Sequence, residues 1–389
     1  MSAAGVDVLI VGAGVAGASV AFHLARLGAG SVLVLDRETV GSGMSSRSSA
    51  LVRMHYSAEP EVQLAVRSDT LFEAWSHLTG QPSCVRRTGF ARIVLPGEEH
   101  KLRANVAMQQ RCGAATRVVD AAELAELANG MRTDDLTYAA WEAHGGYGDG
   151  AIVASDLLAA ARNRGAEYRP HTPVTALLRS QDRVTGVQLG AEKILAEVVV
   201  LAAGVWSPPL LAAAGVDLPI ETEFHQVAVL THEAGQGATV ACIDSTTQTY
   251  FRPEAGGTKT LVGSFVGPRG VDPDEVPATA KAAGLESLIG AAARRVPALA
   301  DAGIAGGVTG VYDMTPDARP MLGEVPGVPG MIVATGFSGT GFKISPAVGE
   351  AIAEFIVSGG PSQVDITPFR PGRFEEGAPI QPPFAYSDE

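Results

Sequence analysis

The sequence predicts an α/β fold: a discontinuous, Rossmann-like nucleotide-binding domain joined to a second α+β domain built on an antiparallel sheet. Three observations support this prediction. The chain begins with a strand, a glycine turn, a helix and a second strand; buried-type strands recur near its C-terminal end; and strands of alternating polarity lie between them. A length of 389 residues is also sufficient for two hydrophobic cores.

The first element is residues 8–37, VLIVGAGVAGASVAFHLARLGAGSVLVLDR. Val8–Val11 and Val32–Leu35 contain only apolar residues, which is typical of parallel strands buried on both faces. Between them, apolar residues recur at helical spacing from Ala16 to Leu27. The stretch therefore has the pattern and the length, about 30 residues, of a βαβ unit.

Three glycines in this unit predict a dinucleotide site. Gly12 is expected to form the tight turn, Gly14 to let the backbone approach a pyrophosphate, and Gly17 to allow close packing of helix and strand. The phosphates would lie at the helix N-terminus, and Asp36 would accept hydrogen bonds from a ribose hydroxyl. The motif alone does not separate NAD from FAD. His23 lies on the apolar stripe of the helix and is expected to be a core residue.

Further helices and strands follow from the hydrophobic period and from the glycine and proline positions. Helices are expected at Glu61–Leu78, Ala104–Leu127 (with turns) and Ser155–Arg164, and one begins near Pro346. Strands are expected at Gly89–Leu95, Val174–Leu178, Val184–Leu189, Val198–Ala202, Val227–Leu230, Gln248–Arg252, Thr260–Phe265 and Met331–Ala334. The last residues, about 25 of them, are rich in proline and charge and are expected to form an extended tail.

This order predicts the division into domains. The nucleotide-binding domain is expected to comprise residues 1–85, 146–220 and 310–374, and the substrate domain residues 86–145 and 221–309, with a C-terminal tail at 375–389.

Composition excludes several functional classes. A formal charge of −13 argues against nucleic-acid binding, which requires clustered basic residues. No apolar segment approaches the length of about 20 residues that a membrane helix requires. The cysteines, Cys84, Cys112 and Cys242, are widely spaced and odd in number, which favours a reducing, cytoplasmic location. No group of His and Cys residues has metal-ligand spacing, so no metal site is expected.

Four segments are similar to a known family: GAGVAG…VLVLDR, SSALVRMHY, TPDARPMLG and GFSGTGFKISPAVGE. Together they resemble the FAD-dependent D-amino-acid oxidase superfamily, and within it the sarcosine oxidase and glycine oxidase branch, over residues 6 to 374. The resemblance implies that the Rossmann-like domain is an FAD-binding domain. A flavin held between both ends of the chain would also use the second glycine-rich loop, which contains Gly336, Gly339 and Gly341.

The glycine motif and the resemblance together give a set of expected FAD-binding residues. They are Gly12, Gly14, Val15, Gly17, Asp36, Arg37, Ser45, Ser46, Arg47, Ser48, Val174, Ala203, Gly204, Trp206, Gly339, Thr340, Gly341, Phe342 and Lys343. Packing alone would also explain Trp206. The helix that follows the second loop would direct its N-terminus at the flavin and stabilise negative charge there.

The resemblance also implies a substrate site. Arg53 and Lys343, 290 positions apart, match an arginine and a lysine that bind the substrate carboxylate in sarcosine oxidases. A buried carboxylate must be paired, and arginine offers a two-pronged partner. The alternative is an ordinary surface salt bridge for each. Tyr56 matches a neighbouring aromatic residue, although packing explains it almost as well.

Other residues are expected near the substrate with less specific support. His55, His225, Tyr250 and Arg252 are candidates, the last two because they share one face of a strand. The loop that contains Asp313, Asp317 and Arg319 lies beside the cofactor in the family, and Arg319 is expected to be an anchor. Thr340 replaces a histidine of the sarcosine oxidase pattern.

The predicted function is FAD-dependent oxidation of the C–N bond of an amino acid or N-alkyl amino acid to an imine. The alternatives are a 2-hydroxy acid oxidoreductase on the same fold and a non-catalytic flavoprotein. The partners are an amine substrate and oxygen or another electron acceptor. FAD is expected to be non-covalent, because Gly310 occupies the position of the attachment cysteine. Leu261 occupies the position of a lysine that promotes oxygen reduction in the family, with Lys259 two residues earlier as a possible substitute.

Overall fold

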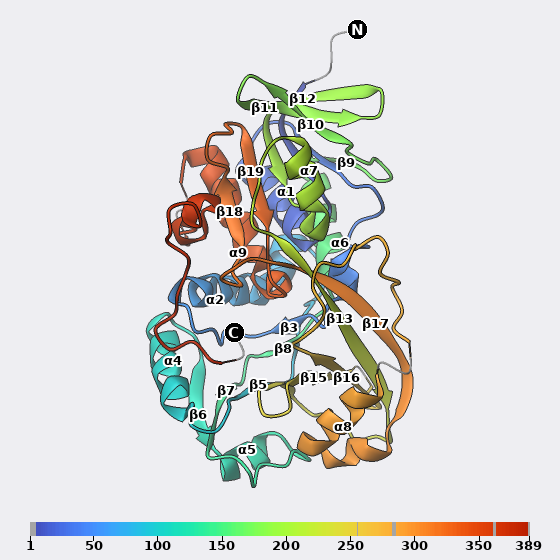
Figure 1. Cartoon of the computed structure of the whole chain (residues 1–389), viewed down its shortest axis with the longest axis vertical. Helices are drawn as coiled ribbons and strands as arrows, with labels where there is room; N and C mark the ends of the chain where they lie inside the picture. Colours follow the sequence, from blue (N-terminus) through green and yellow to red (C-terminus); the bar gives the residue numbers. More distant parts are fainter. Residues whose placement is uncertain (1–4, 255, 282–284, 361–362, 388–389) are drawn as a thin grey trace.

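Two large sheets, one mostly parallel and one mostly antiparallel, form the two halves of the molecule (Figure 1). The computed structural model describes residues 5–254, 256–281, 285–360 and 363–387. In Figure 1 the parallel sheet occupies the upper half and the antiparallel sheet the lower half, with α2 (Glu59–Glu73) crossing between them.

The parallel sheet has the order β9-β2-β1-β12, and β12 continues to β19 at one end and to β11-β10 at the other. Its strands are β1 (Gly5–Val11), β2 (Val32–Leu35), β9 (Glu167–Arg169), β10 (Ala176–Ser180), β11 (Arg183–Leu189), β12 (Glu192–Leu201), β18 (Met321–Glu324) and β19 (Met331–Thr335). Because Val8 pairs with both Val32 and Val198, the central strands end at one edge, where a ligand crevice forms in such folds.

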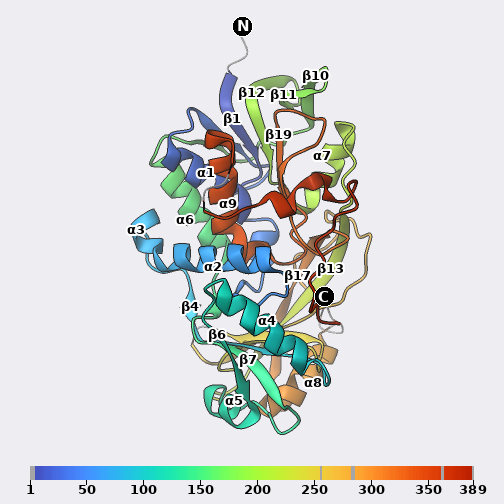
Figure 2. The same ribbon diagram turned by 90° about the vertical axis from the view of Figure 1, so that its left-hand side faces the viewer.

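Helices cover both faces of this sheet. α1 (Val15–Leu27), α6 (Gly150–Arg162) and α9 (Gly341–Ser358) pack together on one face, as Figure 2 shows. α7 (Ser207–Ala213) lies on the other, where Leu211 joins a separate apolar core. α3 (Trp75–Thr79) follows α2.

The antiparallel sheet has the order β17-β13-β16-β15-β14-β5-β7-β6, with one parallel pair, β14 and β5. Its strands are β5 (Phe90–Ile93), β6 (Thr116–Asp120), β7 (Tyr138–Glu142), β13 (Glu221–Thr231), β14 (Ala241–Asp244), β15 (Thr249–Pro253), β16 (Lys259–Ser264) and β17 (Gly303–Met314). The accompanying helices are α4 (Glu99–Arg111), α5 (Ala121–Leu127) and α8 (Glu286–Arg295). A small sheet of β3 (Leu51–Val52), β8 (Gly146–Tyr147) and β4 (Arg86–Arg87) joins the two halves.

This architecture confirms the predicted fold class. The division into domains stays a prediction; β17 runs across its limit at 309/310, and the ends at 1–4 and 388–389 lie outside the described residues. Within the described part of the chain, no helix has both the length and the apolar character of a membrane span.

Three local predictions were wrong. Ala104–Leu127 is not one helix with turns, because β6 interrupts it between α4 and α5. The chain leaves α4 at Gly113, which has a φ of 88°, and the Asp120 carboxylate caps α5 by accepting the Glu123 N–H (2.9 Å). Glycine at a helix end and aspartate at a helix start are both signals of a helix boundary, but the apolar spacing across this stretch was given more weight.

The last helix begins at Gly341, five residues before Pro346. Pro346 has no N–H for the Phe342 carbonyl one turn earlier, and the Ser345 hydroxyl donates to that oxygen instead (2.9 Å). The C-terminal residues do not extend away from the body either. They fold back onto it and bury Tyr386.

Candidate FAD and substrate site

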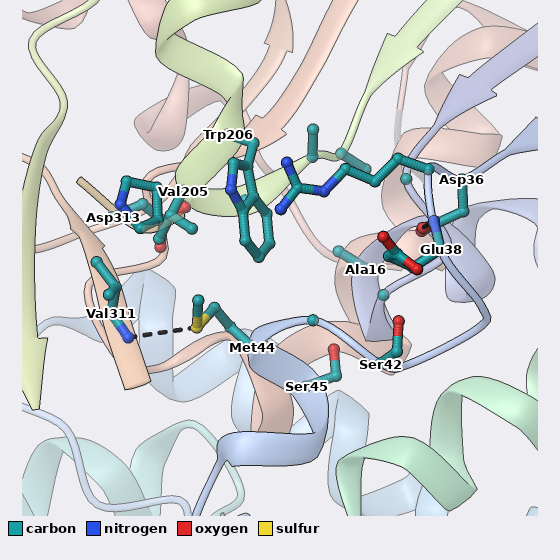
Figure 3. A pocket seen from close by; sticks show the side chains of 18 of the residues that line it. Ala16, Asp36, Glu38, Ser42, Met44, Ser45, Val205, Trp206, Val311 and Asp313 are labelled. Carbon is teal, nitrogen blue, oxygen red and sulfur yellow. Dashed lines mark hydrogen bonds between the residues drawn. The ribbon is translucent and has the colours of Figure 1, made fainter. Parts of the chain in front are cut away.

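A cavity of about 680 Å³ opens at the carboxyl ends of β1, β2 and β12, within the usual volume range of ligand pockets. Figure 3 shows Asp36 and Glu38 on one side, Val311 and Asp313 on the other, and Trp206 between them. Most of the expected cofactor residues line this cavity: Gly12, Gly14, Val15, Asp36, Arg37, Ser45, Arg47, Ser48, Val174, Ala203, Gly204, Trp206, Gly339, Gly341 and Phe342.

The remaining expected residues have other contacts. Gly17 lies inside α1, and the Lys343 ammonium donates to the Gly339 carbonyl (3.4 Å). Ser46 is absent from the described cavity wall, and its hydroxyl donates to the carbonyls of Ser42 (3.1 Å) and Gly43 (3.0 Å). The Thr340 hydroxyl donates to the Phe337 carbonyl (2.7 Å). The Ser46 and Thr340 hydroxyls thus bond local carbonyls, and contact of these two residues with the cofactor stays a prediction.

The first glycine loop has the predicted backbone roles. Gly12 has a φ of 104°, and a Cβ there would lie 2.5 Å from the Ala202 carbonyl oxygen. A Cβ at Gly17 would overlap the Gly12 carbonyl oxygen. At Gly14, only the Ser45 hydroxyl would be close (3.1 Å), so the fold leaves that backbone open toward the cavity. These contacts confirm the turn at Gly12 and the tight packing at Gly17.

Asp36 and Ser45 hold this loop in place. The Asp36 carboxylate at the end of β2 accepts the N–H groups of Ala13 (2.7 Å) and Glu38 (2.8 Å). The Ser45 hydroxyl accepts the N–H of Val15 at the start of α1 (3.1 Å). The first turn of α1 is thereby fixed at the cavity wall, where its free N–H groups suit a phosphate.

Trp206 is positioned by residues from two distant segments. Its indole N–H donates to the Asp274 carboxylate (2.8 Å), which also pairs with Arg37 (2.6 Å), and the Arg37 guanidinium lies 4.2 Å from the centre of the Trp206 ring. Asp274 belongs to the connection between β16 and α8 and also lines the cavity. Arg37 and Asp274 are exposed, so their ion pair contributes at most about 1 kcal/mol; its effect is to orient the indole.

The second glycine loop connects β19 to α9 and borders the cavity from the opposite side. Gly336 and Gly339 have φ values of 70° and 78°, and a Cβ at Gly339 would lie 2.5 Å from the Tyr312 ring. Asp313 stabilises the loop because its carboxylate accepts the Gly336 N–H (2.6 Å). Burial raises the pKa of Asp313 to about 6. The N-terminus of α9 thus lies at the cavity wall.

Arg53 and Lys343, far apart in the sequence, lie close enough to influence each other's charge. Burial lowers the pKa of the Lys343 ammonium well below its usual value, and the charge of Arg53 acts in the same direction, whereas Glu61 opposes both. The Arg53 guanidinium lies 4.1 Å from the centre of the Tyr56 ring. Its Nε and the Tyr56 hydroxyl are buried without a hydrogen-bond partner among the described residues. The Arg53 charge, with an Nε–H that has no partner among the described residues, suits an anion, and a bound anion would favour the charged form of Lys343.

The loop that carries Arg53 and Tyr56 is held from behind. The Met54 N–H donates to the Glu142 carboxylate (2.8 Å), and the Gln109 amide donates to the Tyr56 carbonyl (2.8 Å). Arg53 itself donates to the carbonyl of His55. The loop with Arg53 and Tyr56 is therefore held by α4 and β7 of the antiparallel half.

Burial raises the pKa of Glu142 to about 7, although the Met54 N–H and the Arg53 charge both oppose this shift. The folded state thus binds a proton that the unfolded chain releases near pH 4.5. This contribution to stability is complete below about pH 4.5 and is lost as the pH rises through 7. The total amounts to about 3 kcal/mol.

We expect Glu142→Gln to flatten the fall in unfolding free energy between pH 5 and 8. Urea unfolding at several pH values measures this. The titration of Asp313 contributes the same pH dependence of the unfolding free energy to wild type and variant. The difference between the two curves therefore gives the contribution of Glu142. Equal slopes for wild type and variant would contradict the raised pKa.

The other residues expected near the substrate differ in their position relative to the cavity. Tyr250 is buried and hydrogen-bonds Tyr312, a cavity residue. Arg252 instead donates to the Ser49 carbonyl (2.6 Å) and pairs with Glu254, so it anchors the early loop and the expected substrate contact has no support. Lys259 is exposed and is not among the described residues of the cavity wall.

Both histidines are engaged in contacts. His225 bonds Glu223 (2.9 Å) and stacks on Tyr312 at 3.8 Å. His55 is buried, and burial lowers its pKa well below 6.5, with the charges of Arg92 and Arg53 acting in the same direction. His23, as expected, is buried in α1. Arg319 is an anchor, paired with Glu61 (2.9 Å).

Several residues of the site escaped prediction. Tyr312 could have been predicted from the sequence, because strand alternation places it on the same face as Gly310. Asp274, Glu142 and Tyr386 carried no sequence signal. Asp69, Glu73 and His144 have ligand atoms within 4.8 Å of one another, but Arg87 pairs with Asp69 and the other two are exposed.

Comparison with known proteins places this geometry in a family. Residues 7–355 match the family described as "DAO: FAD dependent oxidoreductase". The chain belongs to this FAD-dependent family. FAD is therefore its cofactor, and the cavity fits that group: a glycine loop with an acidic residue at one end and a helix N-terminus at the other.

Two relatives from this family align with most of this chain. Human mitochondrial sarcosine dehydrogenase is 28% identical over 92% of this chain and 40% of its own. The 4-methylaminobutanoate oxidase (formaldehyde-forming) of Paenarthrobacter nicotinovorans is 29% identical over 94% and 46%. The chain thus spans less than half of these two relatives.

One solved structure is similar over its whole length. L-proline dehydrogenase from P. horikoshii superposes with a TM-score of 0.88 at 26% identity, covering 97% of this chain and 100% of its own. The FAD-dependent D-amino-acid oxidase family and its sarcosine oxidase and glycine oxidase-like branch, expected from four motifs, are confirmed.

Proposed function

We propose that this protein oxidises the C–N bond of an amino acid or N-alkyl amino acid to an imine, which water then hydrolyses. The observation that carries the proposal is that Arg53, which is half-buried, and Lys343, which is buried, lie close enough to interact beside the FAD cavity. The relatives' names support it, because sarcosine, 4-methylaminobutanoate and L-proline are all amines that carry a carboxylate.

Bound flavin supplies a two-electron acceptor for the substrate. The protein's own part begins with Arg53 and Lys343, which form a carboxylate clamp. These two residues would bind the substrate carboxylate, and its negative charge would relieve the repulsion between them. Their positive charge also lowers the pKa of a nearby substrate ammonium, which favours the neutral amine needed for oxidation. The Tyr56 ring packs against Arg53 and limits its movement. The N-terminus of α9 would stabilise negative charge that develops at the cavity wall.

The alternatives receive less support. A 2-hydroxy acid enzyme would require a base for the hydroxyl proton, and His55 and His225 were the candidates. His55 is already bonded to Tyr386 (2.9 Å), and His225 to Glu223 (2.9 Å). A non-catalytic flavoprotein would not need a half-buried arginine and a buried lysine beside its cofactor.

A substrate screen with an artificial electron acceptor tests the proposal. Primary amino acids, N-methyl amino acids and longer N-methylamino carboxylates are compared with their methyl esters. We expect one amine class to be turned over and its ester to be nearly inactive. Activity with ester and acid alike would contradict the clamp, and activity with 2-hydroxy acids alone would favour the alternative.

FAD should be bound without a covalent link. Gly310 lines the cavity, whereas Cys84, Cys112 and Cys242, which are all the cysteines of the chain, are absent from the described cavity wall. Acid precipitation is therefore expected to leave the yellow colour in the supernatant. A washed pellet that stays yellow would show covalent attachment.

The reduced enzyme is expected to react slowly with oxygen and to prefer another acceptor. Leu261 packs with the apolar cluster that contains Leu51 and Tyr250, and it cannot stabilise developing negative charge. Stopped-flow mixing with oxygenated buffer measures the rate, and Leu261→Lys should increase it. Lys259→Met is the control, because Lys259 is exposed. Fast wild-type reoxidation would contradict this prediction.

A further inference from the structure

The C-terminal segment, residues 379–387, joins the two halves of the molecule. At one end, Asp317 accepts the N–H of Ile380 (2.9 Å) and pairs with the fully buried Arg373 (2.8 Å). At the other end, the Asn105 amide of α4 donates to the Phe384 carbonyl (2.9 Å). Figures 1 and 2 show this red trace passing from beside β18 to α4.

The segment places one side chain in the interior. Among the described residues 374–387, Tyr386 alone is buried, and its neighbour Ser387 is fixed by two hydrogen bonds to Glu98 (3.0 and 2.7 Å). The Tyr386 ring stacks on the His55 ring, with centroids 5.8 Å apart, and the Arg92 guanidinium lies 4.8 Å from its centre.

Tyr386 is connected to the clamp through a single residue. Its hydroxyl is 2.9 Å from His55 Nε2, and the carbonyl of His55 accepts a hydrogen bond from the Arg53 guanidinium. Burial lowers the pKa of His55 well below 6.5, and the charges of Arg92 and Arg53 act in the same direction, which favours its uncharged form. A change at Tyr386 that lets His55 move would therefore change the acceptor that orients Arg53.

We infer that Tyr386 is a positioning residue for the substrate carboxylate. Acting through His55, it holds Arg53 in the orientation that binds the carboxylate, so the C-terminal segment completes the substrate site. This inference rests on the proposed function, because it requires that Arg53 bind a carboxylate.

The test uses the flavin-loaded protein and variants of this segment. Tyr386→Phe removes one hydroxyl, and Tyr386→Ala also removes the stacked ring. Phe384→Ala is the matched control, because that side chain is 41% exposed and its anchoring carbonyl remains. The probes are acetate and benzoate, whose dissociation constants follow from changes in the flavin absorption spectrum.

We expect Tyr386→Phe to weaken carboxylate binding about 2- to 10-fold, the usual worth of one hydrogen bond, and Tyr386→Ala to weaken it further. For an amine substrate, KM should rise more than kcat falls. In an Arg53→Ala background the effect of Tyr386→Phe should disappear, because the two residues act through the same contact. Phe384→Ala should leave binding unchanged.

Three outcomes would overturn the inference. Unchanged carboxylate binding in both Tyr386 variants would do so, as would an equal loss in the Arg53→Ala background. A wild-type protein that binds neither probe and oxidises no carboxylate-bearing amine would refute the clamp itself, and with it the proposed function. If Tyr386→Ala fails to fold, carboxylate binding by Tyr386→Phe alone tests the inference.

Discussion

Arg53→Ala is expected to weaken the binding of a carboxylate substrate by about 2–5 kcal/mol, roughly 30-fold to several thousand-fold. The guanidinium is half-buried against Tyr56, with its Nε lacking a partner among the described residues. Its loss would leave a desolvated carboxylate with Lys343 alone, and burial already lowers the pKa of that ammonium. FAD content should stay normal, because Arg53 is absent from the described cavity wall.

Lys343→Met is the matched variant, since it keeps the length of the side chain and removes the charge. It should weaken binding in the same direction, whereas Arg53→Lys should recover part of the affinity because the charge remains without the two-pronged geometry. The apparent KM for the best amine and the flavin content of each purified variant are the measurements. Normal substrate affinity in either Arg53→Ala or Lys343→Met would refute the clamp.

Gly17→Ala should lower the stability of the protein, whereas Gly14→Ala should lower its affinity for FAD. At Gly17 the new Cβ would overlap the Gly12 carbonyl oxygen and lie 3.3 Å from Ile10, so helix and strand must separate. We expect a loss of about 3 kcal/mol or more in unfolding free energy, or failure to fold. At Gly14 the new Cβ meets only the Ser45 hydroxyl, 3.1 Å away.

The Gly14→Ala protein should therefore keep its apo stability within about 1 kcal/mol while its affinity for FAD falls. Urea unfolding of the apoprotein measures the first quantity, and quenching of flavin fluorescence the second. A stable Gly17→Ala protein, or a Gly14→Ala protein with normal FAD affinity, would contradict the roles assigned to these glycines.

The sequence was most informative where a motif requires a particular backbone. The glycines, Asp36 and the apolar strands located the βαβ unit, because each residue type there has a local physical reason. The clamp of Arg53 and Lys343 came from the family resemblance, and the structure brings the two together.

Long-range contacts were not predictable in this way. Asp274 reaches Trp206 from a connection 68 residues away, and Tyr386 reaches His55 across 331 residues. Their side chains carry no pattern that marks such a partner. The charged, proline-rich composition of the C-terminal segment suggested an extended tail, but specific hydrogen bonds to Asp317, Asn105 and Glu98 hold it in place.

The central claim, oxidation of a C–N bond by a flavin held beside a carboxylate clamp, is tested most directly by an anaerobic titration. The flavin-loaded protein is mixed with an amine and, separately, with the 2-hydroxy acid of the same carbon skeleton, and the oxidised flavin absorbance is followed. We predict that the amine bleaches the flavin and releases one carbonyl product per flavin, whereas the hydroxy acid does neither. Bleaching by the hydroxy acid, with none by any carboxylate-bearing amine, would contradict the account.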